Sequence, residues 1–194
     1  MGRETDTPAM VRGLIKRRER GATIVEAAIV FPLLFMTIFA VAEFGLAFKD
    51  WLTVSHSARE GARTGATYGN NVKADLLILE AVGEHLAPAA IQIEEVTIYN
   101  AATGLGTDYD YTPGANCSGT DCCDWSPCPD PDLPAPPYAV PTWNPTLRSV
   151  TAPDTDTVGV RVSYTHDWIT GLFAESTVFT TEVEYHIEPS IFGP

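Results

Sequence analysis

Residues 17–48 read RRERGATIVEAAIVFPLLFMTIFAVAEFGLAF, and this stretch decides the fold. It contains no charged residue between Ala27 and Ala42. As a helix, Ala27 to Phe48 is about 33 Å long, enough to cross a hydrocarbon core of about 30 Å. Its large apolar side chains favour insertion by roughly 4–7 kcal/mol, more than the roughly 2.5–3.5 kcal/mol that Glu43 costs at mid-membrane. We therefore predict a transmembrane helix over 22–48. A buried helix of a soluble protein is the alternative, but the run is too long for one and has no polar stripe.

The charges around this apolar run are asymmetric. The first 21 residues carry a net charge of +3, whereas the whole chain carries −13. The basic residues just before the run are Lys16, Arg17, Arg18 and Arg20. Positive flanks stay in the cytoplasm, so we expect residues 1–21 to form a cytoplasmic leader and the C-terminal body to lie outside. The acidic body repels phosphates, which argues against nucleic-acid binding.

A secretory signal peptide also joins a basic segment to an apolar one. Its apolar region is shorter, however, and a cleavage site of small residues follows it. Here the apolar run leads directly into Lys49, Asp50 and Trp51 with no such site. The one convincing processing site lies before the run.

That site is Gly21-Ala22-Thr23-Ile24-Val25-Glu26, which resembles a type IV pilin-like prepilin signal. With the string AREGAR at 58–63, the chain is similar over 17–67 to TadE-like pseudopilins (TadE/TadG-like family) of the tight-adherence (Tad) pilus system. The resemblance implies that a prepilin peptidase cuts between Gly21 and Ala22. Because glycine has no side chain, an extended backbone can enter a narrow protease site there.

The resemblance also implies a role for Glu26 in assembly. A buried carboxylate is costly unless it is paired, and the cut leaves Ala22 with a charged amine. In related pilins this glutamate is thought to pair with the amine of a neighbouring subunit. Alternatively, Glu26 lies at the headgroup level and stabilises the start of the helix.

The helix is expected to continue over 49–69, beyond the membrane, and to stop near Gly69. Small residues repeat every four positions on two adjacent lines of its surface, Ala58, Ala62 and Ala66 on one and Gly61 and Gly65 on the other. Small side chains let another helix approach closely. The partner is either another subunit or the chain's own globular domain.

The body, 70–194, is predicted to be an extracytoplasmic α+β domain. Residues 72–86 have the spacing of an amphipathic helix, and 91–99 and 157–165 are predicted strands, the first with a bulge at Glu94-Glu95. Alternate residues from Phe179 to Ile187 form another apolar row. Such a half-buried antiparallel sheet needs a helix across its inner face, and the 49–69 helix is the obvious one.

Residues 101–156 are predicted to be a proline- and cysteine-rich insertion without hydrophobic periodicity. All four cysteines lie in it: Cys117, Cys122, Cys123 and Cys128. Outside the cytoplasm, two disulfides are expected, with two connectivities open because adjacent cysteines do not pair readily. Zinc is the rival, but the C-x4-C-C-x4-C spacing is not the usual one. The aspartates nearby lack the ordered spacing of a calcium loop.

No catalytic motif is present, and the four histidines are scattered, so no enzyme, cofactor or metal site is predicted. The expected function is that of a minor pilin or pseudopilin in the bacterial inner membrane, taking part in assembly, adhesion or secretion by a Tad-type pilus. Its expected partners are a prepilin peptidase, other pilins, the assembly platform and membrane lipid. The alternative is a single-pass, membrane-anchored binding module that uses the cysteine-rich loop.

Overall fold

A computed structural model describes residues 9–86, 91–112, 124–133, 138–171 and 173–189. For 9–20 and 85 it describes the backbone alone. The chain divides into two compact units, Met1–Gly45 and Leu46–Pro194. The first unit is helical, and the second holds the sheet and the hydrophobic core.

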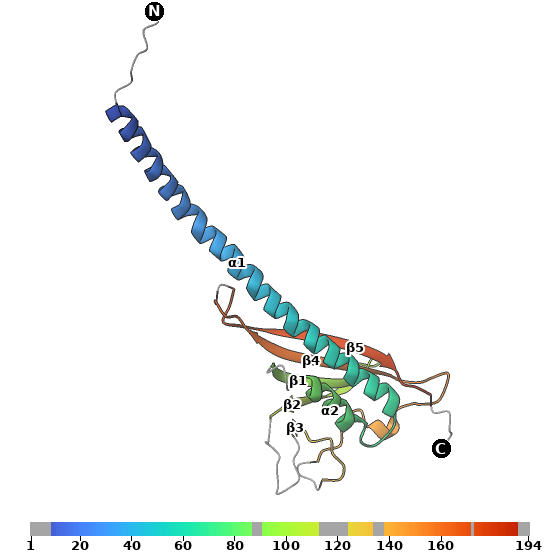
Figure 1. Ribbon diagram of the computed structural model, residues 1–194. Coiled ribbons are helices and arrows are strands. Elements are labelled where there is room, and N and C mark those ends of the chain that lie inside the picture. Colours follow the sequence, from blue (N-terminus) through green and yellow to red (C-terminus); the bar gives the residue numbers. More distant parts are fainter. Residues whose placement is uncertain (1–8, 87–90, 113–123, 134–137, 172, 190–194) are drawn as a thin grey trace, which may run out of the picture. The chain divides into compact units, whose positions relative to one another are not determined.

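Helix α1 (Ala9–Tyr68) runs through both units (Figure 1). It continues through Pro32, and the hydroxyl of Thr37 donates to the Leu33 carbonyl at 2.8 Å, so that this hydroxyl is satisfied within the helix. The helix ends at Gly69, as predicted, where φ is +48°. A Cβ at Gly69 would lie 2.9 Å from Val150 and 3.0 Å from Ile187, so only glycine fits this left-handed cap.

Helix α2 (Ala74–Leu86) begins two residues later than predicted. The Asn71 side chain accepts a hydrogen bond from the Lys73 N–H at 2.9 Å, and Asp75 lies in the first turn, where a carboxylate is favourable. The buried side chains of α2 recur at helical spacing: Ile78, Leu79, Val82 and Leu86. This helix therefore presents one apolar face to the domain core.

The sheet has five antiparallel strands in the order β3-β2-β1-β4-β5. They are β1 (Gln92–Asn100), β2 (Gly106–Tyr111), β3 (Trp125–Ser126), β4 (Thr157–Asp167) and β5 (Ser176–His186). In β4 the predicted alternation is confirmed, because Val158, Val160, Val162 and Tyr164 are all fully buried. The register of β1 shifts between Ile93 and Glu95, where a bulge was predicted.

The α+β prediction is confirmed, with α2 and the part of α1 from Leu46 onward covering one face of the sheet (Figure 1). The structure differs from the sequence expectation within 101–156. This stretch supplies β2, β3 and the 3-10 helix η2 (Pro145–Leu147). Tyr109, Trp125, Cys128 and Trp143 from it belong to the core. Its few apolar residues do not build a separate core, because they complete that of the sheet.

Candidate functional site

The surface of α1 between Gly21 and Gly45 is mostly apolar and exposed, although Glu43 is only 2 % exposed. Side chains such as Ile29, Leu33 and Phe39 are each about half or more exposed, as a membrane-facing helix requires. Within the described residues, Gly21–Tyr68 is the one helix long and apolar enough to cross a membrane, with a mean hydropathy of 2.4 in its most apolar window. None of that window is buried in the fold, unlike a core helix. The chain therefore has the features of a single-pass membrane protein.

Glu26 lies exposed on this apolar helix. It shares a shallow hollow of about 270 Å³ with residues spaced along one helical face, which are Thr23, Ala27, Val30 and Phe31. Among the side chains that the structure describes, Glu26 is the one charged group lining this hollow. The hollow can therefore take an apolar neighbour that also carries a positive charge.

Gly21 occupies an ordinary helical position with no packing demand. A Cβ added there would meet nothing within 4 Å. Glycine in a helix costs roughly 0.5–1 kcal/mol relative to alanine, so the fold gains nothing from it. Ala22 follows in the same helix and is exposed. The backbone of Lys16, Arg17, Arg18 and Arg20 is helical, and their side chains lie outside the described residues.

The small residues of the helix extension pack inside the chain's own domain. Ala58, Ala62 and Ala66 are buried. A Cβ on Gly61 would lie 2.5 Å from Val82 of α2, and one on Gly65 would lie 2.8 Å from Ile78. Of the two partners left open by the sequence, the chain's own α2 and sheet occupy this face.

The cysteines are described in part. Cys128 is buried and disulfide-bonded, and its carbonyl accepts from the Ala139 N–H at 3.0 Å. Cys117, Cys122 and Cys123 lie outside the described residues. Among the residues that are described, no group of three or more histidine, cysteine, aspartate or glutamate side chains is placed to hold a metal.

The sequence did not predict a buried polar cluster that joins α2 to the 101–156 stretch. The Arg148 guanidinium pairs with Asp75, and the Tyr109 hydroxyl donates to the other Asp75 oxygen at 2.9 Å. Arg148 also lies 4.1 Å from the centre of the Trp143 ring. Burial raises the pKa of Asp75, and the charge and hydrogen bond of Arg148 oppose it. Arginine and aspartate are usually exposed, so no pattern marked them as partners.

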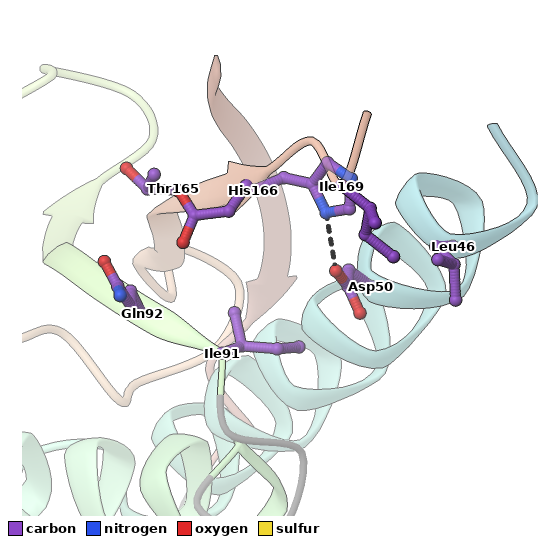
Figure 2. Close-up of a pocket in the computed structure, with 8 residues that line it drawn as sticks. Leu46, Asp50, Ile91, Gln92, Thr165, His166 and Ile169 are labelled. Carbon is purple, nitrogen blue, oxygen red and sulfur yellow. Dashed lines mark hydrogen bonds and ion pairs between the residues drawn. The ribbon is translucent and has the colours of Figure 1, made fainter. Parts of the chain in front are cut away.

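A second polar pair, Asp50 and His166, lies beside a cleft of about 230 Å³ (Figure 2). His166 Nδ1 and Asp50 Oδ2 are 2.7 Å apart. His166 is 5 % exposed, and its Nε2 has no hydrogen-bond partner among the described residues. The alternation of β4 could have predicted that His166 is buried, because it continues the row of buried residues Val160, Val162 and Tyr164.

The comparisons agree with the resemblance drawn from the sequence. No curated protein and no solved structure matches the chain. A family model described as TadE-like protein matches residues 21–63, from the proposed cleavage site through the membrane helix to the small residues that pack against α2. Over residues 21–63, therefore, the chain is similar to TadE-like proteins.

Proposed function

We propose that the chain is a minor pilin or pseudopilin that takes part in assembly, adhesion or secretion by a Tad-type pilus. It is inserted in the bacterial inner membrane with residues 1–21 in the cytoplasm and the domain from residue 70 onward outside. Its role is structural rather than catalytic. The partners proposed are a prepilin peptidase, other pilins, the assembly platform and the surrounding lipid.

The observation that carries the proposal is that the TadE-like match begins at Gly21, directly before the apolar helix. Since a Cβ at this position meets nothing within 4 Å, neither packing nor a left-handed backbone explains the glycine. Gly45 is equally open, so the support comes from the place of Gly21 between the basic leader and the apolar helix, where a narrow protease site would accept only a backbone without a side chain.

Glu26 supports the same proposal from its position in the hollow. One turn of helix separates it from Ala22, whose amine is freed by the cut. A charge that faces lipid is unfavourable until an opposite charge joins it. A second subunit that brings its own N-terminal amine to the hollow satisfies the carboxylate and fixes the axial position of the two helices.

Mass spectrometry of the membrane-purified protein tests the proposal. The mature chain is expected to begin at Ala22. Gly21→Val is expected to leave the leader attached, because a branched side chain blocks the protease site. Gly45→Val is the matched control, since a Cβ at Gly45 also meets nothing within 4 Å in the same helix, and it should mature normally. A Gly21→Val chain that still begins at Ala22 would refute the prepilin assignment.

A further inference from the structure

The cleft beside His166 is built within the second unit, from three parts of the chain. Its lining residues are Leu46, Asp50, Ile91, Gln92, Thr165, His166, Asp167 and Ile169. Leu46 and Asp50 come from α1, where the apolar run predicted to span the membrane ends. The other six come from β1, β4 and the residues that adjoin them (Figure 2). If the proposed membrane topology holds, the cleft lies at the outer headgroup level.

The rim of this cleft is apolar, as expected for a surface at the headgroup level of the membrane. Ile169 is 77 % exposed and Leu46 is 39 % exposed. Phe173, in the same β4–β5 loop as Ile169, is 50 % exposed and packs on Trp168 with ring centres 5.3 Å apart. Aromatic and aliphatic side chains of this kind are typical of the boundary between headgroups and acyl chains.

The interior of the cleft is rich in acceptors and carries negative charge. Asp50 and Asp167 contribute two carboxylates, and none of the described residues that line it is a lysine or arginine. With Nδ1 held by Asp50, a neutral His166 presents Nε2 as an acceptor, and a protonated one still leaves the cleft with a net charge of −1. A neutral His166 therefore suits a cation that donates hydrogen bonds, whereas a protonated His166 has a donor at Nε2 and leaves only the two carboxylates to accept from such a cation.

We propose that this cleft binds the primary ammonium of a phospholipid headgroup, as in phosphatidylethanolamine. The ammonium has three N–H donors for the carboxylates and for His166 Nε2. The acyl chains of the bound lipid extend out of the cleft along Leu46 and Ile169, and these exposed side chains then contact hydrocarbon. This inference rests on the proposed membrane topology, and it gives the domain a lipid-selective contact besides its helix.

The experiment titrates the full chain, in detergent, with a lipid series that differs only in the headgroup nitrogen. Phosphatidylethanolamine and its mono-, di- and trimethylated forms keep one positive charge while losing N–H donors. Native mass spectrometry then gives the dissociation constant of each. We expect affinity to fall stepwise by about tenfold or more in total, as loss of hydrogen bonds to charged groups predicts.

The matched variants are Asp167→Asn in the cleft and Asp154→Asn, an exposed position in the loop before the opposite end of β4. Asp167 is exposed, so its variant should keep the thermal midpoint of the parent. Asp167→Asn should lose most of the preference for phosphatidylethanolamine, and Asp154→Asn should keep it. Equal affinity across the lipid series, or an unchanged preference in Asp167→Asn, would overturn the inference. Alkaline carbonate extraction of the same protein tests its membrane insertion separately, because a peripheral chain is released, and protease protection of the domain in sealed spheroplasts tests which side it lies on.

Discussion

At the scale of single residues, Glu26 places a carboxylate on a helix whose neighbouring side chains are mostly apolar. It lies exposed in a hollow otherwise lined by threonine and apolar side chains. Glu26→Gln keeps the length of the side chain and removes its charge. We expect insertion and cleavage to stay intact. Co-purification with other pilins should fall by about tenfold or more, since the variant cannot form the proposed charge pair with the N-terminal amine of a neighbouring subunit.

Glu84→Gln provides the control for that variant. Glu84 is exposed on α2 and does not line the hollow around Glu26, so its replacement should leave assembly unchanged. Quantitative pull-down of the two variants side by side is the measurement. Equal recovery of partners with both variants would indicate that Glu26 acts only at the headgroup level.

Two helical glycines differ in how closely other atoms pack against them. Gly61 faces α2, where a Cβ would lie 2.5 Å from Val82, whereas a Cβ on Gly83 meets nothing within 4 Å. Gly61→Ala is therefore expected to destabilise the domain by about 1–3 kcal/mol through overpacking. Gly83→Ala should stabilise it by about 0.5–1 kcal/mol, because alanine favours the helix. Chemical unfolding of the full chain in detergent compares them, and a stable Gly61→Ala variant would contradict the close packing of α1 on α2.

At the scale of elements, Asp75 and Arg148 hold α2 to the segment that follows η2. The side chains are 2 % and 0 % exposed, so neither charge reaches water. Arg148→Ala leaves a buried carboxylate without its partner and is expected to cost about 3–5 kcal/mol. The double variant Asp75→Asn, Arg148→Met should recover much of that loss, because it removes both charges. Denaturant unfolding of Asp75→Asn, Arg148→Met and the double variant gives the coupling energy, and additive losses would argue against the pair.

The elements also show what the sequence was able to predict. β4 was predictable because one face is buried and the other solvated, which leaves a period of two in Val158, Val160 and Val162. The membrane helix was predictable from its length and the absence of charge. β2 was missed because Tyr109 is its only buried residue, with acidic neighbours on both sides. The Arg148–Asp75 pair joins residues 73 positions apart, and local patterns carry no information on such a contact.

At the scale of the whole molecule, three buried tyrosines limit stability at high pH, and burial together with the neighbouring Asp75 raises the pKa of Tyr109 the furthest. Burial, reinforced by the Glu184 hydrogen bond, raises the pKa of Tyr99 to about 12, and burial with the Asp50 charge raises the pKa of Tyr164 to about 12. The neutral phenols therefore favour the folded state. Their contribution is complete below the unfolded pKa of about 10 and is lost as pH rises from about 10 to 12.

We expect the thermal midpoint of the domain to fall steeply across that interval. The thermal midpoint of the Tyr164→Phe variant should fall less over this interval, because the variant lacks one ionisable group. The Tyr164 hydroxyl has no hydrogen-bond partner among the described residues, so its removal leaves no partner unsatisfied. Tyr68→Phe, at an exposed position, should follow the parent protein. Thermal unfolding monitored by circular dichroism from pH 8 to 12 is the measurement, and identical curves for all three proteins would exclude this cause.

The last described residues of the chain contact the C-terminal part of α1. The Glu188 N–H donates to the Ala66 carbonyl at 2.9 Å, and Ile187, 1 % exposed, packs where α1 ends at Gly69. During synthesis, α1 leaves the ribosome more than a hundred residues before the strand that closes the domain over it. A nascent chain stopped before residue 187 therefore lacks both the hydrogen bond to Ala66 and the Ile187 side chain beside Gly69, so we expect the C-terminal end of α1 to be held in place only after translation has passed residue 188.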